Sequence, residues 1–292
     1  MSPFRLALRS LARRPGFVAV VVLTLALGIG ANSAIFSVVN AVLLKPLPYR
    51  APDRLALIWS KWANFDKTWV SEAEYLDYQR LNRLFEGVGT WSESGEVTLG
   101  GRQGPESVGA VQMSANMLTV MGVAPAAGRV FSEAEDVPNG PPVAMLGYDI
   151  WRRRYGGDSA VINRPVEVDG QSVVVVGVLP KSFRFPLEFQ NSATAQVVQP
   201  IQTNRSAPER NSHGQYALAR LRPGAEVSQV SRELAALASR WTRERLYPED
   251  MRFTVFAVAV TDEIAGKVRL ALVVLGAAVG LLLLLTAPTS PT

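Results

Sequence analysis

Two long apolar stretches without a single charged residue dominate this sequence. The first covers residues 17–44 and the second covers residues 270–287. A helix of about 20 apolar residues crosses the roughly 30 Å hydrocarbon core of a bilayer, and a soluble domain has no need of one so long. The sequence therefore predicts two transmembrane helices with a globular segment between them.

The charges beside the first stretch predict its orientation. Four basic residues precede it: Arg5, Arg9, Arg13 and Arg14. Because lysine and arginine near a span favour the cytoplasmic side, we expect a cytoplasmic N-terminus, a large extracytoplasmic segment and a location in the cell inner membrane. The basic residues on the outer flanks, Lys45, Arg50, Arg54, Lys267 and Arg269, can reach the lipid headgroups.

Two features of the N-terminal region have alternative interpretations. Residues 1–15 place Phe4, Leu8 and Leu11 on one helical stripe, which predicts a cytoplasmic amphipathic helix lying against the bilayer; the alternative is a positive flank without stable helix. The first stretch could also be a cleaved signal peptide. Its hydrophobicity continues well past any cleavage point, which favours a retained span.

Both predicted spans carry small residues at a spacing of four. Ala26, Gly30 and Ala34 lie in the first, and Gly276 and Gly280 lie in the second. Small residues at this spacing let helices approach closely in lipid, so we expect these five positions to be helix-packing faces. The first stretch is longer than a bilayer requires, and its end is expected to project as a stalk that Pro46 and Pro48 terminate.

Composition excludes several classes of function. Residues 1–54 hold seven Lys or Arg and one acidic residue, which leaves 23 basic and 24 acidic residues in the rest of the chain. The positive charge therefore belongs to the membrane flanks, and no nucleic-acid partner is expected. The chain has no cysteine and one histidine, His213, so disulfides, thiolate sites and multi-histidine metal sites are excluded and no cofactor is expected.

Strand and helix signals alternate between the two stretches. Strands are expected at residues 54–59, 106–112, 142–146, 216–221 and 252–260, helices at 71–88, 114–121, 149–155 and 228–246, and a hairpin at 164–178 that turns at Asp169-Gly170. Ser71 is placed to cap the Glu74 amide at the start of one helix. This order predicts an α+β domain interrupted by an insertion, in which the last strand–helix–strand block pairs with the first strand.

No catalytic constellation stands out. Phosphate-binding loops and nucleophile elbows are absent, so the chain is not expected to be an enzyme. His213 lies in a polar segment where solvent exposure is the default, and Glu133, Glu135 and Asp136 are expected to form a solvated turn. Phe183 and Phe185 are expected to close a core or a partner surface.

Several ordered motifs resemble one family. The run ALGIGANSAIFSVVNAVLLKPLPY (residues 26–49), followed by residues 53–55, resembles the start of MacB-like, FtsX-type ABC transporter permeases, and especially the duplicated orphan permeases of acidobacteria. Residues 150–158, residues 168–170 and the segment VVGVLP with FRFP (residues 175–186) are similar to the periplasmic core domain of that family. Residues 218–224 (LARLRPG) resemble its final block.

The resemblance implies an organisation for the whole chain. Residues 16–44 would be transmembrane helix 1 and its stalk, residues 45–266 a periplasmic core domain, residues 267–287 transmembrane helix 2, and residues 288–292 a tail. A porter-like subdomain would be assembled from both ends of the core domain, with a second subdomain inserted at about residues 90–210. Such permeases work with a separate ABC ATPase and transmit its motion to the periplasm for export or envelope functions.

The functional expectation is therefore a non-catalytic permease subunit, either as a homodimer or beside a second permease half. Members of this family continue for many residues beyond the second span, whereas this sequence ends soon after it. We therefore expect a truncated permease without the segment expected to engage the ATPase. One alternative is a membrane-anchored periplasmic binding or scaffold module with no coupling to an ATPase. A third hypothesis, an extracytoplasmic hydrolase, would require a polar pocket with perturbed acids.

Overall fold

The computed structural model describes residues 47–264 apart from 82, 102 and 188–194, together with the single positions 16, 26, 29, 30, 33, 266 and 274. The chain divides into two compact units, Met1–Pro46 with Ala265–Thr292, and Leu47–Ile264. Only the second is described in continuous detail. Its fold is α+β, as the alternation of strand and helix signals predicts.

The strands of the described region are β1 (Leu55–Trp62), β2 (Phe65–Thr68), β3 (Val70–Ser71), β4 (Phe85–Leu99), β5 (Glu106–Met113), β6 (Ala127–Gly128), β7 (Val143–Leu146), β8 (Pro165–Val168), β9 (Gln171–Val178), β10 (Val197–Pro200), β11 (His213–Leu221) and β12 (Thr254–Ala259). The helices are α3 (Glu72–Gln79), α4 (Met117–Met121), α5 (Tyr148–Tyr155) and α6 (Val227–Arg243), with 3-10 turns η2 (Pro52–Arg54), η3 (Ser159–Val161) and η4 (Glu249–Met251).

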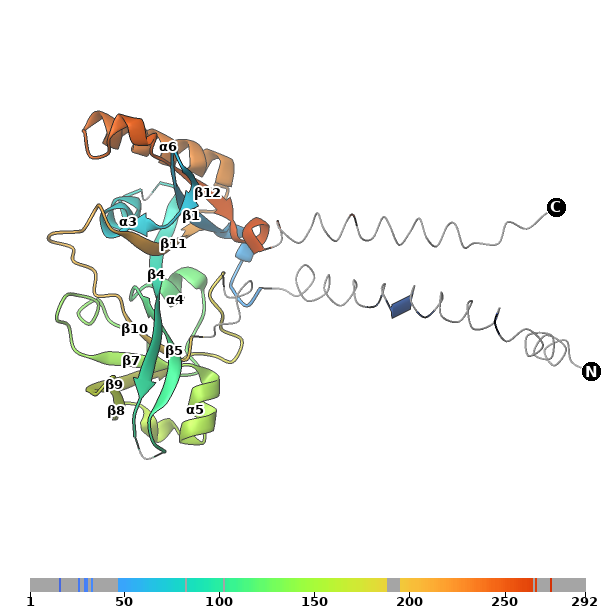
Figure 1. Ribbon diagram of the computed structural model, residues 1–292, viewed down its shortest axis with the longest axis vertical. Helices are drawn as coiled ribbons and strands as arrows, with labels where there is room; N and C mark the ends of the chain where they lie inside the picture. The colour runs from blue at the N-terminus through green and yellow to red at the C-terminus, as the bar shows by residue number, and fades with distance from the viewer. Residues whose placement is uncertain are drawn as a thin grey trace, which may run out of the picture. The chain divides into compact units, whose positions relative to one another are not determined.

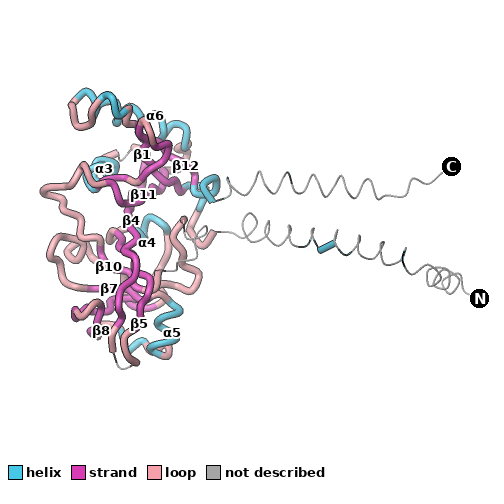
Figure 2. Tube along the Cα trace, viewed as in Figure 1, coloured by secondary structure: helices cyan, strands magenta, loops and turns pink. Residues whose placement is uncertain are grey.

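These strands form one mixed sheet, in which nine follow the order β12-β1-β11-β4-β5-β10-β7-β9-β6. Beside this path, β2 pairs with β1, β3 pairs with β11, and β8 pairs with β4 and β9. Most neighbours are antiparallel, whereas β10 runs parallel to β5 and β9 runs parallel to β7. Strand β4 is 15 residues long and pairs first with β11 and then with β5, so it passes through the whole domain (Figure 2). The predicted return of the last block is confirmed, because β11 and β12 flank β1.

Two hydrophobic cores lie along the sheet. The first core forms where α3 and α6 pack on β1, β11 and β12, and its large members include Tyr75, Tyr78 and Trp241 (Figure 1). The second core forms where α5 covers β4, β5, β7 and β9, with Leu99, Leu146 and Ile150 fully buried. Each helix thus buries its apolar face against the part of the sheet next to it.

Aromatic rings connect the middle of the domain. Trp91 of β4 stacks on Tyr216 of β11, with ring centroids 4.9 Å apart, and on Phe185, with centroids 5.4 Å apart. Phe183 and Phe185 are both buried, which confirms the expectation that they close a core. In the same strand, a Cβ on Gly89 would lie 2.7 Å from Met117 Sδ, so this glycine lets α4 approach β4.

The helix predicted at residues 71–88 is shorter than expected. Its start is confirmed, because Ser71 Oγ accepts the Glu74 amide and the Glu74 side chain accepts the Ser71 amide. The helix ends at Gln79, and the chain enters β4 at Phe85. The second half of the predicted helix was wrong because pairing of β4 with two neighbouring strands outweighs local helix propensity.

Candidate functional site

The chain enters and leaves the Leu47–Ile264 unit at one end of the sheet. Strands β11 and β12 both run antiparallel to β1, with Leu55 opposite Arg220 and Ala56 opposite Ala259. The start of β1 and the ends of β11 and β12 therefore lie together. We call this region the junction end, and it comprises residues 47–54, Arg220, Leu221 and residues 259–264.

The segment after the first predicted span is fastened to three separate elements. The Tyr49 hydroxyl donates to the Arg184 carbonyl oxygen at 2.9 Å, and Tyr49 is buried. The Arg50 amide donates to the carbonyl oxygen of Met121 at 3.2 Å, and Arg54 Nη2 donates to that of Leu221 at 2.6 Å. Residues 49–54 are therefore hydrogen-bonded to α4, the 183–185 loop and β11.

The segment that follows β12, residues 260–264, also contacts the rest of the domain. Val260 and Ile264 are buried, and the Glu263 carboxylate pairs with Lys67 Nζ at 2.5 Å. Within β12, Ser231 Oγ of α6 accepts the Ala257 amide at 3.0 Å, so the helix satisfies part of the outer edge of this strand. Residues 49–54 thus lead directly into β1, and residues 260–264 follow directly from β12.

One member of the junction end is a buried arginine. Arg220 is only 2% exposed, and its Nε donates to the Val120 carbonyl oxygen at 2.7 Å. Burial lowers the pKa of Arg220, and the nearby guanidinium groups of Arg50 and Arg54 lower it further. No described group accepts a hydrogen bond from Arg220 Nη2.

The sequence contains a signal for this residue. Arg220 lies two residues after Leu218 in strand β11, so both side chains point to the same face of the sheet. Leu218 is fully buried. A charged residue at an inward position of an apolar strand requires partners, and this requirement marks it as a candidate for function.

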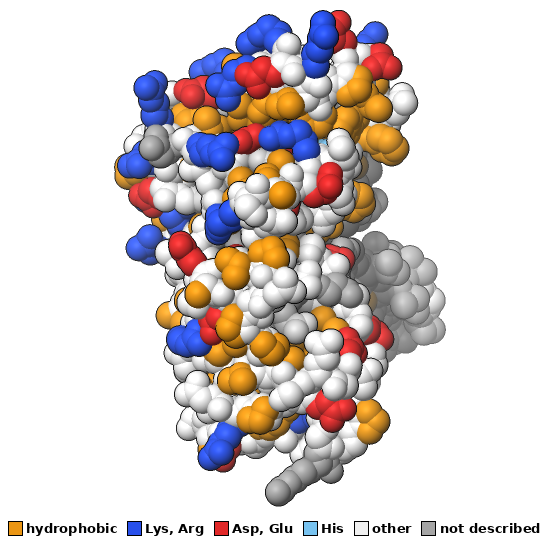
Figure 3. Space-filling model, turned by 90° about the vertical axis from the view of Figure 1, so that its left-hand side faces the viewer, with side chains coloured by type: hydrophobic (Ala, Val, Ile, Leu, Met, Phe, Trp, Pro, Cys, Tyr) orange, Lys and Arg blue, Asp and Glu red, His pale blue; other side chains and the backbone are white. Residues whose placement is uncertain are grey.

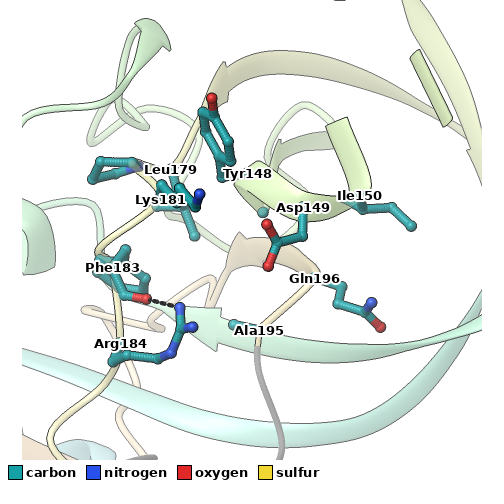
Figure 4. Close-up of a pocket in the computed structure, with 11 residues that line it drawn as sticks. Tyr148, Asp149, Ile150, Leu179, Lys181, Phe183, Arg184, Ala195 and Gln196 are labelled. Carbon is teal, nitrogen blue, oxygen red and sulfur yellow. Dashed lines mark hydrogen bonds between the residues drawn. The ribbon is translucent and has the colours of Figure 1, made fainter. Parts of the chain in front are cut away.

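A small pocket opens at the start of α5 (Figure 4). Its volume is about 110 Å³, and its walls are the first turn of α5, residues 179–184 and residues 195–196. Asp149, Lys181 and Arg184 place charges of both signs around it. Sites for small molecules usually enclose about 300–1,000 Å³, so this pocket is too small for a drug-sized substrate.

A buried carboxylate organises the first core. Glu74 is fully buried and accepts hydrogen bonds from Ser60 Oγ at 3.1 Å and from the Tyr247 hydroxyl at 2.5 Å. His213 Nε2 lies 2.9 Å from the same carboxylate. The expectation of a solvent-exposed His213 was wrong, because β11 begins at this residue and its ring packs edge-on against Trp62.

The predicted solvated acidic turn is also corrected. Asp136 is fully buried and accepts the amides of Ala115 at 3.0 Å and Gln202 at 2.8 Å. Glu135 is largely buried and forms a bidentate pair with Arg129. Two of the three carboxylates therefore have structural partners within the domain.

Most residues predicted to act in the membrane lie outside the described part of the chain: Arg5, Arg9, Arg13, Arg14, Ala34, Gly276 and Gly280. Ala26 and Gly30 are described as exposed helical positions. No helix among the described residues is both long enough and apolar enough to cross a membrane, and the stretches 17–44 and 270–287 fall outside them apart from single positions.

The described residues also contain no group of carboxylates and histidine suited to a metal ion.

Charges of both signs are interspersed on the face of the domain drawn in Figure 3. Basic and acidic side chains alternate there, and hydrophobic groups lie between them. The face therefore agrees with the balanced charge of the sequence after residue 54.

Comparison with known proteins defines the family. A model described as the MacB-like periplasmic core domain matches residues 18–237 of the 292-residue chain. The protein is thus of the MacB-like ABC permease type. It belongs to the family of MacB-like periplasmic core domains.

Solved structures agree on the fold. A domain of a presumed permease from Porphyromonas gingivalis has a TM-score of 0.53 at 16% identity and covers 72% of this chain and 92% of its own. The periplasmic region of MacB from Actinobacillus actinomycetemcomitans has a TM-score of 0.52 at 12% identity and covers 81% of this chain and 98% of its own. At these identities the likeness shows the fold alone. A comparison with curated protein sequences finds no match.

Proposed function

We propose that this chain is a non-catalytic permease subunit of a MacB-like ABC transporter, located in the inner membrane with residues 47–264 outside the cytoplasm. In this proposal a separate ATPase supplies the energy, and the chain relays its motion to the extracytoplasmic domain. Membership of the MacB-like periplasmic core domain family supports the transporter class. The two apolar stretches support membrane anchoring at both ends.

The observation that carries the proposal is the construction of the junction end. Residues 49–54 are bonded to α4, the 183–185 loop and β11, and β12 pairs with β1 over six residues before the chain departs. A displacement of either flanking segment therefore passes into β1, which lies between β11 and β12 in the sheet. Packed elements transmit such displacements because protein interiors are close-packed.

The alternative of a binding or scaffold module requires a ligand site or a partner surface. The described pocket at the start of α5 is small, and its rim combines Asp149 with Lys181 and Arg184. A pocket of about 110 Å³ holds only a small group. The geometry therefore favours mechanical relay over capture of a substrate in this domain.

Copurification with the cognate ATPase tests the proposal. The complete gene product, expressed with the ATPase subunit, should purify as a complex that hydrolyses ATP. The permease chain alone should hydrolyse none, because its sequence contains no phosphate-binding loop. The control is an ATPase subunit whose phosphate-loop lysine is replaced. Turnover that persists without a functional ATPase subunit would contradict the non-catalytic role.

A further inference from the structure

We propose that the pocket at the start of α5 binds a small zwitterion, an α-amino acid no larger than alanine. In this proposal the carboxylate of the ligand lies between Lys181 and Arg184, and its ammonium group lies beside Asp149. The inference goes beyond the relay of motion and does not depend on it, because it uses only residues that line the pocket.

The pocket lies where two parallel strands end. Strand β7 ends at Leu146 and leads into α5, and strand β9, which is parallel to β7, ends at Val178 and leads into residues 179–184. Strand β10 is antiparallel to β7 and begins after residues 195–196, so these residues belong to the same end of the sheet. In open sheets with parallel strands, ligands bind in the crevice outside the carboxyl ends of those strands. The topology therefore places this pocket where ligands bind in such sheets.

Backbone contacts hold the walls of the pocket in place. The Gly147 amide donates to the Gln196 carbonyl oxygen at 2.8 Å. The Leu179 amide donates to the Leu146 carbonyl oxygen, also at 2.8 Å. A Cβ on Gly147 would lie 2.6 Å from the Ala195 carbonyl oxygen, so only a glycine permits this close approach. Walls that are already fixed cost little ordering when a ligand binds.

Three charged side chains line the pocket. The charged ends of Asp149, Lys181 and Arg184 face the space between α5 and residues 179–184 (Figure 4). Within the described part of the chain, none of the three takes part in an ion pair. Arg184 Nη1 donates to the Phe183 carbonyl oxygen at 2.6 Å, which uses one of the five N–H donors of a guanidinium group. The charges around the pocket are therefore available to a ligand.

The arrangement of these charges selects a zwitterion. Lys181 and Arg184 come from the segment after β9, whereas Asp149 comes from the first turn of α5, so the positive and negative groups lie on different walls (Figure 4). A carboxylate matches the planar fork of N–H donors on Arg184, and an ammonium group matches the carboxylate of Asp149. A ligand with only one charge is repelled by the group of like sign on the other wall.

The volume of the pocket limits the size of the ligand. The pocket encloses about 110 Å³, and a water molecule takes about 30 Å³ of the liquid, so the space is that of about four water molecules. Glycine and alanine match this volume, whereas amino acids with bulky side chains exceed it. The ligand is therefore an effector of the domain, smaller than the substrates that drug-sized pockets hold.

Thermal unfolding of the full chain with three related ligands tests the site. The chain is purified in a neutral detergent, and its unfolding midpoint is followed while L-alanine, propionate or ethylamine is added at constant ionic strength. Propionate lacks the ammonium group of alanine, and ethylamine lacks its carboxylate. A ligand that binds the folded state raises the midpoint. The wild-type chain should need about tenfold less alanine than either analogue for the same rise, because each analogue loses one charge-assisted contact.

Two variants separate the two walls of the site. Lys181→Gln should need about tenfold more alanine for the same rise but no more ethylamine. Asp149→Asn should need about tenfold more alanine but no more propionate. Arg164→Gln, which changes an exposed arginine outside the pocket, should match the wild type. Each variant is compared with its own midpoint without ligand, so a loss of stability does not imitate a loss of binding.

Three results would overturn the inference. The same rise with alanine in the wild type, Lys181→Gln and Asp149→Asn would show a general effect of the amino acid on the solvent. An equal response of the wild type to alanine and propionate would make the pocket a site for simple anions. The absence of any rise with alanine would show that the pocket does not bind it. A cytoplasmic location of residues 47–264 would contradict the proposed function without altering this titration, so the two failures are distinguishable.

Discussion

At the scale of single residues, Glu74 holds the most demanding position in the first core. It is fully buried and accepts hydrogen bonds from Ser60, Ser71 and Tyr247 while contacting His213. Glu74→Ala should lower the free energy of unfolding by roughly 3–5 kcal/mol, because several buried donors lose their acceptor at once. Urea unfolding followed by tryptophan fluorescence measures this loss.

The matched control for Glu74 is a glutamate on an exposed helix position. Glu233→Ala in α6 should change the free energy of unfolding by less than about 0.5 kcal/mol, because Glu233 is exposed. If the two substitutions cost the same, Glu74 does not organise the first core.

The ion pair between Glu135 and Arg129 should make the free energy of unfolding depend on pH in the acidic range. The Arg129 guanidinium lowers the pKa of Glu135 from 4.5 to about 2, and hydrogen bonds from Ser132 support the shift. A depressed pKa contributes stability that is present above pH 4.5 and lost as the pH falls toward 2. Glu135→Gln should therefore unfold at a lower temperature than the wild type at pH 7, and the difference should shrink between pH 4.5 and pH 2.

Thermal unfolding midpoints across that pH range provide the measurement. Glu133→Gln is the control, because Glu133 is exposed in the same turn. A constant difference between wild type and Glu135→Gln down to pH 2 would show that the pair with Arg129 does not shift this carboxyl group.

At the scale of elements, β6 depends on a glycine. Gly128 has a positive φ of 71°, and a Cβ there would overlap the carbonyl oxygen of Val176 in the neighbouring β9. Gly224 has a similar φ of 80° but open space around it. Gly224→Ala should cost about 1 kcal/mol, the left-handed backbone penalty of a side chain. Gly128→Ala should cost roughly 1–3 kcal/mol more, because the strands must also separate.

Denaturant unfolding of both variants isolates the strand contact from the backbone effect. Equal losses for Gly128→Ala and Gly224→Ala would mean that β6 can shift away from β9 without cost.

The elements that sequence predicted are those with local signals. The capping pattern at Ser71 marks the start of α3, the Asp169-Gly170 turn marks the β8–β9 hairpin, and Gly122 ends α4 in a left-handed conformation. Strand β4 carries no such signal. Its glycines resemble loop residues in sequence, whereas in the structure Gly89 admits Met117 and the strand is stabilised by pairing with β11 and β5.

The candidate site was harder to predict than the fold. Arg50 and Arg54 are visible in the sequence as outer flanking charges, but Arg220 is 166 positions beyond Arg54 and joins them only because β11 pairs with β1. Likewise, His213 and Glu74 meet through the pairing of β3 with β11. Contacts of this kind follow from sheet topology, which periodicity in one segment does not specify.

At the scale of the whole molecule, the Leu47–Ile264 unit is an α+β domain whose first and last strands, β1 and β12, are paired in one sheet. The domain boundaries and the inserted subdomain at about residues 90–210 stay predictions, as do the packing faces of the two spans. The acidobacterial subtype stays a prediction too. Family membership and the paired strands of the junction end support the relay of motion through this sheet.

The most direct test of this account is the side of the membrane on which the domain lies. The chain has no cysteine, so a single introduced thiol receives a label without background. Ser206→Cys places it on an exposed loop of the domain, and Ser10→Cys places it in the N-terminal segment. Intact spheroplasts are treated with a membrane-impermeant maleimide. The account predicts that residue 206 is labelled in intact spheroplasts and residue 10 only after lysis. Protection of residue 206 until lysis would contradict it.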